Sequence, residues 1–88
     1  MKKPQILNKS QIAAVFALNR GTISGWVLKG CPIIRRGRPG YEAQFDPQKL
    51  LDWRIADLLE QGVEEEYIML DVQAILARLR QLKKETAR

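Results

Sequence analysis

The chain has 88 residues, enough for one small domain, and its 45% hydrophobic content disfavours global disorder. With no histidine and one cysteine, Cys31, the sequence excludes a disulfide framework within one chain and the usual Cys/His zinc sites. The net charge of +5 is uneven, because residues 1–44 carry +7 and residues 45–88 carry −2. A basic half joined to a mildly acidic half favours a polyanion-binding module attached to a second element, although ordinary surface charge is the simpler alternative.

Three helix starts share one local pattern. Asn8, Asn19 and Asp46 are N-cap residues, and at each one the preceding residue is apolar and pairs with an apolar residue four positions after the cap. These hydrophobic staples are Leu7 with Ile12, Leu18 with Ile23, and Phe45 with Leu50. The pattern predicts helices over residues 9–17, 20–29 and 47–61. Only two or three residues separate the first two, which is typical of a helix-turn-helix.

The helix over residues 20–29 carries two interior glycines, Gly21 and Gly25, each of which costs about 1 kcal/mol relative to alanine. On a helical wheel both lie with Ser24 and Leu28, opposite Ile23 and Trp26. Small residues on an outward face let the backbone approach another molecule closely, as the second helix of a helix-turn-helix does in the DNA major groove. The predicted DNA-contacting residues of this helix are Arg20, Gly21, Thr22, Ser24, Gly25 and Lys29. Alternatively, tertiary packing simply tolerates the glycines on a surface helix.

A β-hairpin is predicted next, with Ile33–Ile34 and Tyr41–Phe45 as its strands and a Gly/Pro turn between them. Arg35, Arg36 and Arg38 lie within this loop, where arginines contact phosphates or enter a narrow minor groove. A hairpin directly after a recognition helix is the wing of a winged helix-turn-helix. The fold class is therefore mainly α with a small β-hairpin, and the alternative for the wing is a solvated basic turn without a ligand.

A fourth helix is expected within residues 63–88. It carries an apolar stripe at heptad spacing, formed by Ile68, Val72, Ile75, Leu79 and Leu82. Because the stripe spans only about two heptads, two interpretations are open: pairing with another chain, which we favour, or folding back onto the same chain. If α-helical pairing with another chain is correct, residues 1–62 form the DNA-binding domain and residues 63–88 form a dimerisation element. The protein is then a homodimer or a higher oligomer.

Catalytic signatures are missing from the sequence. It has no glycine-rich loop ending in Gly-Lys-Ser/Thr and, without histidine, no Ser-His-Asp or Cys-His set. We expect a protein that is not an enzyme and that needs no metal or cofactor. No apolar run approaches the roughly 20 residues of a membrane span and no signal peptide is visible, so we expect an intracellular protein without membrane contact.

Residues 7–53 resemble the N-terminal DNA-binding domain of the small subunit of lambda-type phage terminases. The shared pattern is Asn8-Lys9-x-Gln11, Phe16, Thr22-Ile23-x-x-Trp26, Gly30-x-Pro32, a basic glycine-rich hairpin, and Phe45-Asp46. The resemblance implies a protein of the bacterial host cytoplasm that recognises the packaging-initiation site on viral double-stranded DNA and recruits the large subunit, which holds the ATPase and nuclease. It also implies that the second helix and the wing contact DNA, and that the third helix and the residues after it contribute to a dimer.

Excisionases and MerR-like regulators use a related plan, so a small transcription regulator or a recombination directionality factor is the alternative function. A third possibility, from another class, is a coiled-coil adaptor whose basic half only balances charge. If the protein is such an adaptor, it should not bind DNA even at low salt.

Overall fold

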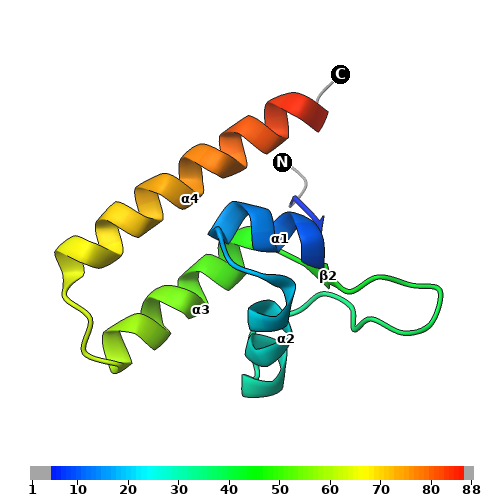
Figure 1. Ribbon diagram of the computed structural model, residues 1–88, viewed down its shortest axis with the longest axis horizontal. Coiled ribbons are helices and arrows are strands. Elements are labelled where there is room, and N and C mark those ends of the chain that lie inside the picture. The colour runs from blue at the N-terminus through cyan, green and yellow to red at the C-terminus, as the bar shows by residue number, and fades with distance from the viewer. Residues whose placement is uncertain (1–4, 87–88) are drawn as a thin grey trace.

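The computed structural model describes residues 5–86. Its helices pack around α1, with α4 along one side of it and α2 and α3 along the other, while the loop that precedes β2 projects away from the body (Figure 1). In chain order the elements are β1 (Leu7–Asn8), α1 (Lys9–Phe16), α2 (Arg20–Lys29), β2 (Gln44–Phe45), α3 (Pro47–Glu60) and α4 (Glu65–Thr86). The predicted class, a mainly helical winged helix-turn-helix followed by a C-terminal helix, is confirmed.

The three predicted N-caps are confirmed. At α1 the N–H of Gln11 donates to Asn8 Oδ1 over 2.8 Å, and the N–H of Asn8 donates back to Gln11 Oε1 over 2.9 Å, which completes a capping box. At α2 the N–H of Thr22 donates to Asn19 Oδ1 over 2.7 Å. At α3 the N–H of Gln48 donates to Asp46 Oδ1 over 3.0 Å. Local sequence therefore fixes where these helices begin.

The first three helices also end in the same way, because each is followed by a residue in the left-handed region of backbone conformation. Ala17, Gly30 and Gly62 have φ of 55°, 95° and 84°. In each case the next residue's N–H reaches back five positions, as the N–H of Cys31 does to the Trp26 carbonyl over 3.0 Å, so orphan carbonyls are satisfied. The helix predicted to reach Ala17 stops at Phe16, because Ala17 adopts this turn conformation.

The hairpin differs from the predicted one in its pairing. Ile33 and Ile34 do not form a strand; the ladder is an isolated bridge between Arg35 and Gln44 and another between Arg38 and Tyr41. The two-stranded sheet instead pairs β2 with β1 in antiparallel register, Leu7 with Phe45 and Asn8 with Gln44. A two-residue strand such as β1 has no alternation for sequence reasoning to detect. At the tip, Gly40 has φ of 85° after Pro39, as the third position of a type II turn requires.

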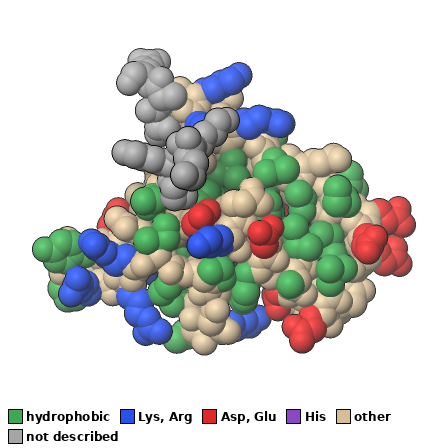
Figure 2. All heavy atoms as spheres, turned by 180° about the vertical axis from the view of Figure 1, so that it is seen from behind, with side chains coloured by type: hydrophobic (Ala, Val, Ile, Leu, Met, Phe, Trp, Pro, Cys, Tyr) green, Lys and Arg blue, Asp and Glu red, His purple; other side chains and the backbone are tan. Residues whose placement is uncertain are grey.

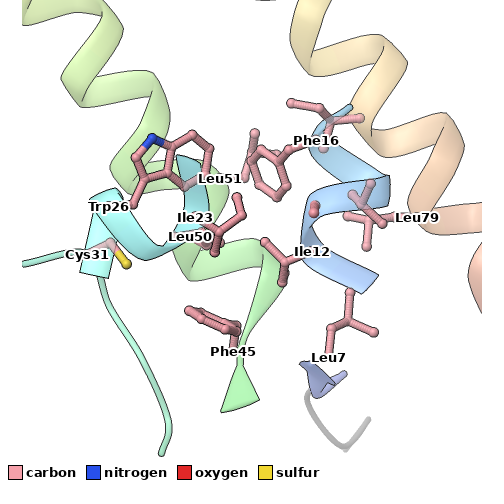
Figure 3. Packing of buried hydrophobic residues seen from close by; sticks show 13 residues of the cluster. Leu7, Ile12, Phe16, Ile23, Trp26, Cys31, Phe45, Leu50, Leu51 and Leu79 are labelled. Carbon is pink, nitrogen blue, oxygen red and sulfur yellow. The ribbon is translucent and has the colours of Figure 1, made fainter. Parts of the chain in front are cut away.

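The hydrophobic core is built by all four helices and β2. Ile12, Ile23, Phe45 and Leu50 have 0% exposure, and Leu79 reaches from α4 into the same group (Figure 3). The Trp26 ring contacts Phe16 edge-on, with centroids 5.5 Å apart, and lies 5.7 Å from Trp53. Cys31 is 6% exposed, and burial raises the pKa of its thiol, so this cysteine is an inert packing residue.

The apolar stripe on α4 faces the core of its own chain. Ile68, Ile75 and Leu79 are 4%, 1% and 9% exposed, and Val72 and Leu82 pack against the core of the same chain. The Arg78 guanidinium also donates to the Val15 carbonyl over 3.0 Å, which ties α4 to α1. The stripe therefore packs on its own chain, which agrees with the fold-back interpretation, while the homodimer stays a prediction. A heptad spacing buries one helix face equally well against the same chain or a second one, so the spacing alone does not choose between them.

Candidate nucleic-acid interface

The orientation of α2 agrees with the helical wheel. Its inner face carries Ile23 and Trp26, at 0% and 4% exposure, whereas Leu28 on the opposite face is 90% exposed. The Trp26 ring also contacts Arg54 of α3, whose guanidinium carbon lies 5.0 Å from the ring centroid and whose side chain pairs with Asp57 at 3.1 Å. Packing thus fixes the rotation of α2 about its axis, which leaves Gly21 and Leu28 exposed and Ser24 and Gly25 half-buried.

The two glycines of α2 differ in their surroundings. A Cβ on Gly25 would meet nothing within 4 Å, so nothing in the fold requires glycine at that position. A Cβ on Gly21 would lie 3.2 Å from Asn19 Oδ1, the atom that caps the helix. Gly25 therefore costs helix propensity without a compensating contact inside the described chain, whereas Gly21 also leaves room for the cap.

The polar residues of α2 are not equally available for base contacts. The Thr22 hydroxyl donates to Asn19 Oδ1 over 3.0 Å, so it reinforces the cap. The Ser24 hydroxyl accepts from Lys9 Nζ over 3.0 Å. Arg20 and Lys29, at the two ends of the helix, are exposed. Cations at the ends and small residues between them suit phosphate contacts at the ends and close backbone approach in the middle.

A hollow of about 460 Å³ lies between α1, α2 and the wing, which we define as residues 35–44. It is lined by Lys9, Arg20, Ser24, Val27, Ile33, Arg36, Gly37, Tyr41, Glu42 and Ala43. Three cations from three separate elements, Lys9, Arg20 and Arg36, thus face one space with a single carboxylate, Glu42. Of the predicted DNA-contacting residues, the fold brings Arg20, Ser24 and Arg36 together here.

The other two wing arginines point elsewhere. Arg35 borders a different hollow, with β1 and Gln44, because successive side chains of an extended segment point to opposite sides. Arg38 lies at the tip, with its guanidinium carbon 5.3 Å from the centroid of the Tyr41 ring. All three arginines are exposed. The wing therefore spreads its charge over two sides and the tip rather than focusing it at one point.

Two further residues of this region are not predicted from the sequence. Lys9 is brought to α2 by the packing of the two helices, and Tyr41, 59% exposed, borders the hollow and stacks with Arg38. The only sequence signal for Lys9 was its place in the Asn8-Lys9-x-Gln11 pattern. For Tyr41 the sequence predicts only a place in a strand of the hairpin.

Charge is segregated along the molecule as well as along the sequence. Seen from behind, Lys and Arg side chains gather at the end that bears the wing, and Asp and Glu at the opposite end, where α3 connects to α4 (Figure 2). Among residues 5–86, no group of three or more Cys, Asp and Glu side chains is arranged to hold a metal ion. Within the same range, none of the helices combines the length and apolarity that crossing a bilayer demands.

Comparison with known proteins points to one group, although no family model matches the chain. The DNA-packaging protein NU1 homolog of Escherichia coli K12 is 30% identical over 70 residues, which cover 80% of this chain and 38% of that protein. The terminase small subunit of Escherichia phage lambda is 34% identical over 47 residues, 53% of this chain and 26% of that protein. The prophage DNA-packing protein NohA of Escherichia coli K12 is 34% identical over 47 residues, 53% of this chain and 25% of its own length.

The chain thus spans between a quarter and two fifths of the length of these relatives. All three carry names that refer to DNA packaging or to terminase. The predicted resemblance is therefore confirmed: this chain is similar to the small subunits of lambda-type phage terminases.

Proposed function

We propose that this chain binds double-stranded DNA with α2 and the wing, as the DNA-recognition part of a small terminase subunit. In this role it marks the packaging-initiation site on viral DNA and recruits the large subunit, and it performs no catalysis itself. Two observations support this role. The relatives carry names that refer to DNA packaging or terminase. Cations from three elements also line one hollow beside α2.

One observation carries the DNA-binding half of the proposal. Lys9, Arg20 and Arg36 come from α1, α2 and the wing, yet they line one hollow beside the small outward face of α2. Such a convergence of cations from separate elements suits a phosphate backbone that runs past the N-terminus of a helix. With α2 in the major groove, the wing lies beside it, in reach of the neighbouring phosphates or the minor groove.

Lys9 provides the sharpest test of this geometry, because no linear wing or recognition-helix pattern includes it. We expect Lys9→Ala to weaken binding to any duplex and to reduce the slope of log K against log salt by about one unit, the value of one phosphate contact. Arg80→Ala is the matched control, since Arg80 is an exposed cation on α4. Fluorescence anisotropy of a labelled duplex across a salt series measures both slopes.

If the full chain does not bind duplex DNA even at low salt, the proposal is wrong and the adaptor alternative gains support. If Lys9→Ala and Arg80→Ala change the slope equally, binding is diffuse and the hollow is not the phosphate site.

Gly25 gives a second prediction, on stability and binding together. Gly25→Ala should raise the free energy of unfolding by about 0.8–1 kcal/mol, because alanine is the better helix former and its Cβ meets no neighbour. The same change, and more strongly Gly25→Leu, should weaken binding to a selected DNA site, because a side chain there holds the helix away from the groove.

Thermal melts followed by circular dichroism, together with anisotropy, check the Gly25 series. A Gly25→Leu protein that melts lower than the parent and binds DNA normally would contradict the proposal that this glycine serves the groove.

The alternative, a transcription regulator or recombination factor, shares every DNA-contacting feature described above. The two are separated by where the preferred DNA site lies in the genome. Sites selected from genomic fragments by the full chain should fall at the start of the packaging region, beside the terminase genes. Sites at a promoter or an attachment site would instead favour the alternative.

A further inference from the structure

Leu28, one residue before the C-terminal end of α2, is a large apolar residue on the helix face that otherwise carries glycine and serine. Its exposure of 90% exceeds that of every other exposed large hydrophobic residue among residues 5–86, the next being Tyr67 and Leu70 at 65%. Single exposed leucines are common on protein surfaces and by themselves need no explanation. Leu28 is of interest because it lies on the face of α2 that we propose contacts DNA.

Leu28 lies on the same stripe as Gly21, Ser24 and Gly25, and it follows Ser24 and Gly25 by about one helical turn. Glycine and serine barely rise above the helix backbone, so Leu28 is the tallest side chain on this face. A surface that fits closely against α2 meets the Leu28 methyl groups at the point where the small residues end.

Hydrogen-bonding groups are scarce on this face. The glycines offer no side chain and the Thr22 hydroxyl donates to Asn19 Oδ1, so the Ser24 hydroxyl, which accepts from Lys9, is the one O–H of these residues left to donate to a base. In the DNA major groove a leucine can contact only one distinctive apolar group, the C5 methyl of thymine. No acidic residue on α2 opposes this approach, and Lys29 follows directly on the chain.

We propose that Leu28 is a specificity-determining residue that reads the C5 methyl group of a thymine in the major groove. This inference rests on the proposed DNA binding by α2 and goes beyond it by naming the base feature that is recognised and the residue that recognises it. It predicts a preference for A·T pairs at one or two positions that depends on the methyl group rather than on a hydrogen bond.

The test begins with duplex sites selected from a random pool by the full chain. Each thymine of the selected site is then replaced in turn by deoxyuridine, which removes only the methyl group. We expect affinity to fall about fourfold at one or two positions, the effect of losing about one buried methyl-sized group, and to stay unchanged elsewhere.

Leu28→Ala should bind the intact site about fourfold more weakly and should no longer respond to deoxyuridine at those positions. The fold should not change, since the side chain is 90% exposed. Leu59→Ala is the matched control, because Leu59 is a 48% exposed leucine on α3, and it should bind like the parent and keep the deoxyuridine response.

DNA binding by the chain and thymine recognition by Leu28 can fail separately in these measurements. If the chain selects no duplex site, both are wrong. If a site is selected but no thymine methyl affects affinity, or if Leu28→Ala keeps the full deoxyuridine response, the role of Leu28 is overturned while DNA binding stands.

Discussion

Replacing Ile75 with alanine should lower the free energy of unfolding by about 2–5 kcal/mol, the usual cost of truncating a buried isoleucine. Ile75 lies on α4 with 1% exposure, inside the core shared with α1. A domain of this size has only about 5–10 kcal/mol of total stability, so the variant should lose a large share of it. Urea unfolding followed by tryptophan fluorescence measures the loss, because Trp26 and Trp53 lie in or against the core.

Leu70→Ala is the matched control, since Leu70 is a leucine of the same helix with 65% exposure. We expect this change to alter the free energy of unfolding by no more than about 0.5 kcal/mol.

The pair of variants also tests whether the α4 stripe is covered by its own chain or by a second one. If the stripe were a seam between two chains, Ile75→Ala would leave a folded monomer, and the midpoint of the parent would rise with protein concentration. An Ile75→Ala protein that keeps the parent's stability as a monomer would therefore contradict the packing of α4 on its own chain.

Replacing Arg35, Arg36 and Arg38 together with alanine should have the largest effect on DNA binding. We expect weaker binding to every duplex and a salt slope reduced by roughly 2–3 units, about one for each lost phosphate contact. Stability should change little, because all three side chains are exposed. Filter binding or anisotropy over a salt series gives the slope, and a melting curve checks the fold.

Single replacements refine the wing prediction. Arg36 borders the hollow beside α2, whereas Arg35 borders a hollow on the other side of the wing. If only the α2 side of the wing faces DNA, Arg36→Ala should account for more of the loss than Arg35→Ala. An unchanged slope in the triple variant would exclude the wing as a phosphate clamp.

Residues close together along the chain are enough to predict the local structure. Asn8, Asn19 and Asp46 fix the helix starts, because a cap needs only its own side chain and the next few backbone N–H groups. The outward position of Gly21 and Gly25 follows from the helical period and from the apolar residues Ile23 and Trp26. The basic wing follows from three arginines beside a Pro-Gly turn. Each of these features depends on residues within a few positions of one another.

Which distant segments meet depends instead on how the whole chain packs. The stripe on α4 shows which face of the helix must be buried, but the turn at Gly62 and the packing on α1 decide that its own chain buries it. The place of Lys9 beside Ser24 depends on how α1 and α2 pack, since 15 residues separate the two along the chain. The pairing of β1 with β2 joins segments with two helices between them. Local hydrogen bonds and periodicity set each element, whereas long-range contacts depend on the shape of the whole core, to which many residues contribute jointly.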